Sequence, residues 1–205
     1  MITIESCCTS LEQALAAQSR GANRIELCID LSVGGITPTH DLIRETVSQL
    51  SIPVNVLVRD AKCLDFVYDN DSLNRMINDI EFCRMVGAAG VVIGALNSDG
   101  YIDIPTMQRL MAAAQSLSVT FHRAFDVCSE TPQDALEKVI SLGCQRVLSS
   151  GQAANAWEGR MVLAEMVEQA AGRIIVMPGC GVRPDNLDAL RLVTHASEFH
   201  GTAIP

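Results

Sequence analysis

Three short segments of this 205-residue chain repeat one pairing of residue types, an acid followed two positions later by a metal-ligating side chain. Two of the segments carry a cysteine and the third carries a histidine, and each stands close to the end of a predicted strand. The pairs are Glu5 with Cys7, Glu26 with Cys28, and Glu198 with His200. Side chains two positions apart on a strand point to the same face. If the three strands are neighbours, carboxylates, thiols and an imidazole therefore converge.

The sulfur and nitrogen atoms of these segments suggest a metal site. Cys7, Cys28 and His200 are ligand types that suit Cu(I) or Zn(II). The alternative is that the two thiols pack as small apolar groups while His200 forms a hydrogen bond with a glutamate. The sequence contains no Cys-x-x-Cys or His-x-x-x-His spacing. Both interpretations stay open at this point.

The carboxylates suggest acid–base catalysis as a second interpretation. Glu5 or Glu26 would serve as a general base if burial raised its pKa. Arg59, His122 and Arg123 would polarise a carbonyl or bind a carboxylate or phosphate. The alternative is that the acids and arginines form structural ion pairs, because buried charges are usually paired. Strand alternation places His122 and Arg123 on opposite faces, so a regular strand would point one of them inward.

Two later loops are candidates for binding an anion. Ser150 and Gly151 follow one predicted strand, and Gly179 and Gly181 follow the next, just before a predicted helix. Backbone N–H groups in such turns, together with a helix N-terminus, bind phosphate groups. A plain tight turn is the alternative for the Gly-x-Gly segment.

The elements that must position these residues alternate strictly between strand and helix. Strands are predicted at residues 2–8, 24–29, 53–59, 90–96, 118–125, 146–150, 173–178 and 197–201. Helices are predicted at residues 10–21, 39–50, 71–87, 104–116, 131–142, 155–171 and 184–194. The capping pattern that begins at Ser10 and the Thr131-Pro132 pair mark two of the helix starts. The near-continuous apolar strands are typical of a parallel sheet covered on both faces.

Eight alternations of this kind predict a single (β/α)₈ TIM-barrel domain over residues 1–205. Closure of the barrel would place the last strand beside the first, so the three acid-containing segments would lie on adjacent strands about 4.8 Å apart. Chemistry in these barrels lies where the strands end. The sequence leaves no room for a full eighth helix, and the uncovered side favours a homodimer or higher homo-oligomer.

Composition excludes other classes of function. Hydrophobic residues make up 48% and charged residues 19% of the chain, and the net charge is -9. Nucleic acid and membranes are therefore poor partners, because no cluster of Lys and Arg and no long apolar run occurs. The first residues lack the features of a signal peptide, which predicts a cytoplasmic protein with reduced cysteines. No motif for an organic cofactor is evident.

A family resemblance adds to this interpretation. The segments that carry it are 10–17, 21–28, 34–38, 99–103, 120–126 and 198–200, of which Phe121-His122-Arg123-Ala124-Phe125-Asp126 is the most specific. They resemble the CutC family, known as copper homeostasis proteins. The resemblance implies a (β/α)₈ barrel, a cytoplasmic oligomer and a link to copper. It also implies Cu(I) ligands at the ends of the first two strands, which fall on Cys7 or Cys8 and on Cys28.

Two hypotheses of different classes follow. In the first, the protein takes part in copper homeostasis and binds Cu(I) through rim cysteines, with His200 as a further ligand. In the second, it is an enzyme of unknown reaction that acts on a small anionic metabolite, with a glutamate base and His and Arg electrophiles. The sequence does not decide whether the protein is an enzyme.

Overall fold

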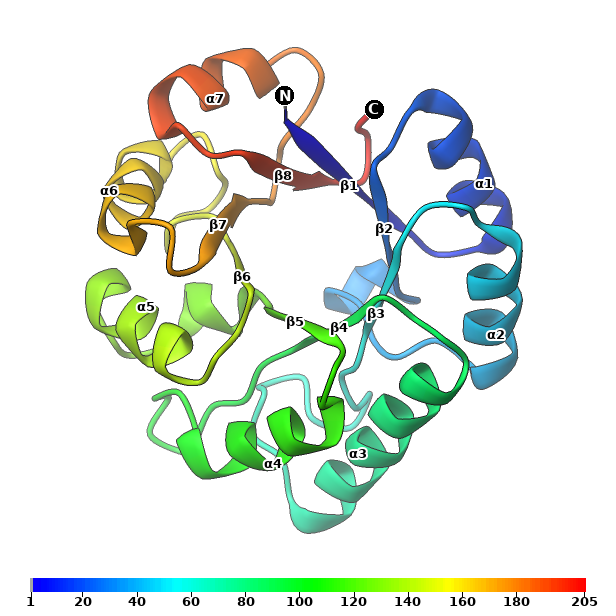
Figure 1. Ribbon diagram of the computed structural model, residues 1–205. Coiled ribbons are helices and arrows are strands. Elements are labelled where there is room, and N and C mark those ends of the chain that lie inside the picture. Colours follow the sequence, from blue (N-terminus) through cyan, green and yellow to red (C-terminus); the bar gives the residue numbers. More distant parts are fainter. Residues whose placement is uncertain (1) are drawn as a thin grey trace.

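Eight parallel strands stand in a ring in the computed structural model, which describes residues 2–205 (Figure 1). The strands are β1 (Thr3–Cys8), β2 (Arg24–Leu27), β3 (Val54–Leu57), β4 (Gly90–Ile93), β5 (Ser118–Phe121), β6 (Arg146–Ser149), β7 (Ile175–Pro178) and β8 (Glu198–Gly201). All eight predicted strands are confirmed, and most of them are shorter than predicted by a few residues. The strands point away from the viewer in Figure 1, so their carboxyl ends lie on the far side.

Helices surround this ring. They are α1 (Leu11–Arg20), α2 (His40–Gln49), α3 (Asn70–Met85), α4 (Ile104–Ala114), α5 (Pro132–Ser141), α6 (Arg160–Ala170) and α7 (Leu187–Thr194), with short 3₁₀ helices η1 (Leu31–Val33) and η2 (Arg123–Val127). The predicted caps form: the Ser10 side chain accepts a hydrogen bond from the Gln13 N–H, and Thr131 accepts one from Asp134. Each bond satisfies an N–H group that has no partner within its helix.

The order of the strands confirms the predicted (β/α)₈ barrel and its key adjacency. The hydrogen-bonded order is β7-β6-β5-β4-β3-β2-β1-β8, so β1 lies between β2 and β8. β7 and β8 lie side by side, but no strand pairing joins them among the described residues, so the barrel is nearly closed. Residues 202–205 contain no eighth helix, and the ring of helices is open between α7 and α1 (Figure 1).

The buried side chains of the protein include an apolar core and a polar sector. Large apolar side chains such as Phe121, Phe125 and Phe199 are fully buried, and burial of this kind is the main force that stabilises the fold. Several buried positions on β8, β1, β2 and β3 carry acids, bases or an amide instead. The predicted metal ligands and both predicted glutamates therefore lie in this part of the barrel.

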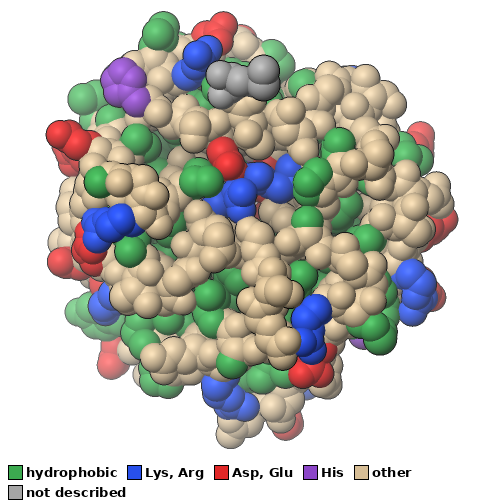
Figure 2. All heavy atoms as spheres, viewed as in Figure 1, with side chains coloured by type: hydrophobic (Ala, Val, Ile, Leu, Met, Phe, Trp, Pro, Cys, Tyr) green, Lys and Arg blue, Asp and Glu red, His purple; other side chains and the backbone are tan. Residues whose placement is uncertain are grey.

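The surface shows two further features. Figure 2 shows the face at which the strands begin, with basic and acidic side chains together at its centre. Exposed large apolar side chains are spread over different elements, for example Met85 on α3 and Leu192 on α7. Among the described residues, no helix combines the length and the apolar character that crossing a membrane requires.

Candidate functional site

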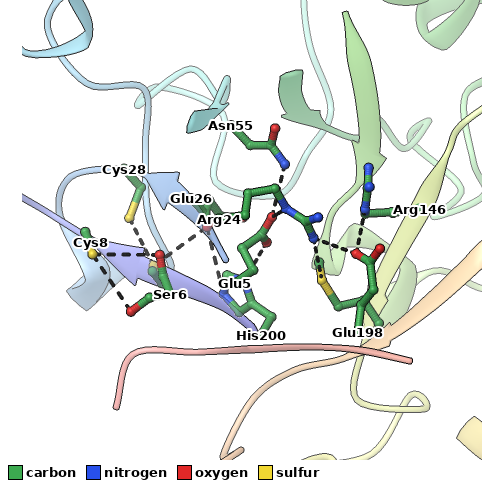
Figure 3. A network of polar contacts seen from close by, with 12 residues as sticks. Glu5, Ser6, Cys8, Arg24, Glu26, Cys28, Asn55, Arg146, Glu198 and His200 are labelled. Atoms are coloured by element: carbon green, nitrogen blue, oxygen red, sulfur yellow. Dashed lines mark hydrogen bonds and ion pairs between the residues drawn. The ribbon is translucent and has the colours of Figure 1, made fainter. Parts of the chain in front are cut away.

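A network of ion pairs fills the part of the barrel where β1, β2 and β8 begin (Figure 3). Arg24 lies between two acids: its Nε donates to Glu5 Oε2 at 2.5 Å and its Nη2 donates to Glu198 Oε2 at 2.6 Å. Arg146 on β6 also donates to Glu198 Oε2, at 2.7 Å. The alternative of structural ion pairs inside the barrel therefore holds for Glu5 and Glu198, and their partners are arginines from β2 and β6.

Glu5 is held on all sides by donors. Besides Arg24, its oxygens contact Asn55 Nδ2 at 3.0 Å and His200 Nδ1 at 2.9 Å. Burial opposes ionisation, but the hydrogen bond from His200 and the charge of Arg24 outweigh it and lower the pKa of Glu5 to about 2. Glu5 does not line the cavity described below. An ionised, fully bonded carboxylate away from the cavity is poorly placed to act as a general base, so Glu26 is the stronger of the two predicted candidates.

Three possible metal ligands meet where β1, β2 and β8 approach the cavity. One donor atom from each of Cys7, Glu26 and His200 lies within 4.8 Å of the others, and all three residues are buried. Cys7 Sγ lies 3.7 Å from Glu26 Oε1, and His200 Nε2 lies 4.0 Å from the same oxygen. The second oxygen, Glu26 Oε2, is buried without a hydrogen-bond partner. The arrangement offers sulfur, nitrogen and oxygen to an ion that enters from the cavity.

The protonation of this cluster follows from its burial and its charges. Burial raises the pKa of Glu26, and the charge of Glu5 acts in the same direction. Burial favours the neutral ring of His200, but the charge of Glu26 and the hydrogen bond to Glu5 outweigh it and raise the pKa of His200 to about 9. The hydrogen bond with Cys28, together with burial, raises the pKa of the Cys7 thiol. A bound metal ion would displace protons from such ligands.

Cys28 lies behind the cluster. Its Sγ is 3.5 Å from Cys7 Sγ, and it packs in a small apolar group with Cys7, Leu57 and Val92. Cys28 is fully buried and does not line the cavity. The ligand set predicted from the sequence was Cys7, Cys28 and His200. The structure instead brings Glu26 to Cys7 and His200, and of these three residues Cys28 has its sulfur contact with Cys7.

A cavity of about 780 Å³ opens where the strands end. Cys7, Glu26 and His200 form part of its wall, together with Arg59, His122 and Arg123. Its volume falls in the range of about 300–1,000 Å³ that is typical of small-molecule sites. With Gly181, seven of the predicted site residues therefore line a common space.

The two-residue alternation of a regular strand does not extend to His122 and Arg123. Both residues line the cavity, although a regular strand would point one of them away. β5 ends at Phe121, and the 3₁₀ helix η2 begins at Arg123. The change of backbone conformation removes the two-residue period, so both side chains face the same space.

The predicted anion-binding residues have different surroundings. The N–H of Ser150 donates to the Asp126 carboxylate at 3.0 Å, and the N–H of Gly151 donates to Ser149 Oγ at 2.8 Å. The N–H of Gly179 donates to the Ser149 carbonyl, which extends the sheet. Of the four residues, Gly181 lines the cavity. The donors of the first loop are thus already paired within the protein.

Sequence reasoning overlooked two residues of the polar sector. Arg24 was not singled out, although it stands two positions before Glu26 and therefore shares its face. Asn55 on β3 lies within a strand that otherwise reads as apolar, Val-Asn-Val-Leu. A polar residue inside such a run was the available signal, since buried polar groups need partners.

Comparisons with known proteins agree with this architecture. The model of the CutC family matches residues 2–205. A relative from Histophilus somni (strain 2336), described as a family protein CutC, is 46% identical over 200 residues, which cover 98% of this chain and 82% of the relative. The crystal structure of the putative copper homeostasis protein CutC from Streptococcus agalactiae superposes with a TM-score of 0.91 at 30% identity over 100% of both chains. An aldolase with a TM-score of 0.73 at 14% identity, covering 98% of this chain and 90% of the aldolase, shares the fold alone.

Proposed function

The chain belongs to the CutC family, and we propose that it binds Cu(I) at the wall of the barrel cavity as part of copper homeostasis. Cys7 and His200 are the principal ligands, and Glu26 is the third. The observation that carries the proposal is the meeting of these three donor groups within 4.8 Å of one another on three adjacent strands.

The donor set fits a metal ion. Glu26 Oε2 is buried without a partner, and such an atom gains most from a positive charge. The thiol of Cys7 is a soft ligand, which favours Cu(I) among the common metals. Cys28 places a second sulfur 3.5 Å from the first. Glu5 supports the site from behind, because its hydrogen bond fixes the ring of His200.

Copper, rather than another metal, is supported by a relative. The Streptococcus agalactiae protein is described as a putative copper homeostasis protein, and this chain superposes on its full length. We extend that role to this chain and expect it to act in the cytoplasm. All eight cysteines are free thiols, which suits a reducing compartment.

An anaerobic titration tests the copper proposal. Cu(I) is added to the protein against a competing chelator, and the Cys7→Ser and His200→Gln variants are compared with the wild type. We expect about one ion per chain in the wild type and at least about tenfold weaker binding in each variant, because each variant loses a direct ligand. Cys63→Ser is the matched control, since Cys63 lies outside the cavity and bonds to Ser72.

The same titration separates the two ligand sets. Cys28→Ser should weaken binding less than Cys7→Ser if Glu26 is the third ligand, and Glu26→Gln should then weaken it more than Cys28→Ser. A parallel series with Zn(II) shows whether the site selects copper. Binding of equal strength in the wild type and the Cys7→Ser variant would refute the proposal.

A further inference from the structure

Arg59 is a buried cation without an acidic partner. The residue is 4% exposed, and its guanidinium donates to the carbonyl oxygens of Val33 at 2.8 Å, Gly35 at 3.1 Å and Leu64 at 2.6 Å. Its Nε is buried with no hydrogen-bond partner. None of the ion pairs formed by the described residues includes Arg59. Buried charges are usually paired, so this one lacks its counter-charge.

His122 presents a second unpaired donor. Its Nδ1 accepts a hydrogen bond from the Ala124 N–H at 3.2 Å, so in the neutral ring the proton resides on Nε2. Burial and the charge of Arg59 lower the pKa of His122 to about 3, which keeps the ring neutral near pH 7. Nε2 is buried and has no partner. An N–H group in this state lacks an acceptor.

The Arg59 guanidinium and the His122 ring lie against the same side chain, Phe66. The Phe66 ring contacts both groups, with the Arg59 guanidinium 4.4 Å from its centroid and the His122 ring 4.9 Å away. All three residues line the cavity. Phe66 has a positive φ of 66°, a strained conformation for a residue with a side chain.

Most of the charged side chains that line the cavity are positive, as Arg59 is. Its lining includes three arginines, Arg59, Arg123 and Arg183, and a single acid, Glu26. This excess of positive charge occurs in a chain whose net charge is -9. Arg123 forms an ion pair with Asp126, and Arg183 forms one with Asp185. Of the three arginines that line the cavity, Arg59 is therefore the one without an ion pair among the described residues. A cleft with charge of one sign concentrates ligands of the opposite sign.

We propose that the cavity binds a small organic oxyanion, a carboxylate or phosphate monoester, with its charged oxygens on Arg59 and a hydrogen bond from His122 Nε2. A guanidinium and a neutral N–H donor suit an acceptor-only group of this kind. Because Arg59 Nε and His122 Nε2 are buried, the Phe66 ring beside both groups moves aside to admit the anion. Leu57, Leu148 and Val182 provide apolar wall for the organic part of the ligand. The proposal goes beyond copper binding and does not depend on it.

Calorimetric titration of metal-free protein tests the proposal. The protein is stripped with a chelating resin and titrated separately with malonate, inorganic phosphate and the neutral analogue malonamide. We expect saturable binding of malonate or phosphate and none of malonamide, and the comparison of the two anions distinguishes a carboxylate ligand from a phosphate ligand. The absence of metal makes the result independent of the copper proposal.

Variants locate the binding site. His122→Asn retains an acceptor for the Ala124 N–H but removes the Nε2 donor, and Arg59→Gln removes the charge. We expect about a tenfold loss of affinity in His122→Asn and a larger loss in Arg59→Gln, as for hydrogen bonds to charged groups. Arg44→Gln is the matched control, because it makes the same change of net charge at an exposed helix position outside the cavity. It should bind within about twofold of the wild type.

Two outcomes would overturn the proposal. One is a lack of saturable binding of both anions by the wild-type protein. The other is affinity equal to that of the wild type in the His122→Asn variant, shown by circular dichroism to be folded. This variant decides the matter if Arg59→Gln does not fold, since Arg59 also holds three backbone carbonyl groups.

Discussion

Two buried histidines of this barrel, His200 and His122, have opposite protonation states because of their neighbours. His200 lies 2.9 Å from Glu5 Oε1 and 4.0 Å from Glu26 Oε1, and these acids outweigh burial to raise its pKa to about 9. His122 has Arg59 as its charged neighbour, and burial together with that charge lowers its pKa to about 3. Near pH 7 one ring is therefore a cation within an acidic cluster, and the other is a neutral donor.

The low pKa of His122 predicts sensitivity to acid. Between its unfolded pKa of about 6.5 and its folded pKa of about 3, the unfolded chain binds a proton that the native protein does not. Stability therefore falls as the pH drops below about 6.5, by about 1.4 kcal/mol per unit for this group. Relative to His122→Asn, the free energy of unfolding of the wild type should fall by about 2 kcal/mol between pH 7.5 and pH 5.

Urea unfolding of both proteins at the two pH values measures this difference. Other titrating groups contribute equally to the wild type and the variant, so they cancel in the comparison. A parallel loss of stability in the two proteins would show that His122 is not the group responsible.

Among the elements, η2 organises the loop that follows β6. The Asp126 carboxylate at the end of this 3₁₀ helix accepts hydrogen bonds from the Ser149 hydroxyl at 2.6 Å, the Ser150 N–H at 3.0 Å and the Gln152 N–H at 3.2 Å. It also pairs with Arg123 Nε at 2.8 Å. The Asp126 carboxylate therefore accepts the hydrogen bond of the Ser150 N–H, a group that the sequence suggested for binding an external anion.

Removal of this carboxylate should be costly. Asp126→Ala leaves several donors unpaired, and each buried one costs roughly 1–3 kcal/mol. We expect the free energy of unfolding to fall by about 3 kcal/mol, measured by urea denaturation. The exposed Asp185, which pairs with Arg183 at 3.2 Å, provides the control. Asp185→Ala should change the free energy of unfolding by less than about 0.5 kcal/mol. Equal effects in the two variants would contradict the role given to Asp126.

At the scale of the whole molecule, the seam between β7 and β8 lacks the strand pairing that joins the other neighbouring strands among the described residues. β2 is paired on both sides, with β1 and β3, whereas β8 pairs with β1 alone in the described structure. Segments with fewer interactions open at a lower free energy than the rest of a fold.

Hydrogen exchange should reveal this seam. Amides of β8 (Glu198–Gly201) are expected to exchange faster than those of β2 (Arg24–Leu27), a strand of equal length with two partners. Exchange measured by mass spectrometry on peptides that cover each strand provides the test. Slower exchange in β8 than in β2 would mean that the seam is closed by interactions stronger than those seen here, such as contacts with a second copy of the chain.

Much of the framework follows from the sequence by itself. Short-range rules suffice for it. Apolar runs, capping residues such as Ser10 and Thr131, and strict alternation predicted the eight strands, the seven helices and their arrangement as a barrel, which the structure shows nearly closed. The spacing of Glu5 with Cys7, and the adjacency of β8, β1 and β2, also follow from local periodicity and the topology of the barrel.

The tertiary structure alone decided which polar groups meet. The pairing register sets Cys7 opposite Glu26 and Glu5 opposite both Arg24 and His200, so Glu26, rather than Cys28, joins Cys7 and His200. Because η2 begins at Arg123, this side chain lines the cavity. The Asp126 carboxylate accepts a hydrogen bond from the Ser150 N–H, which is then not free for an external anion. These outcomes depend on contacts between residues far apart in the chain, and local periodicity carries no information about them.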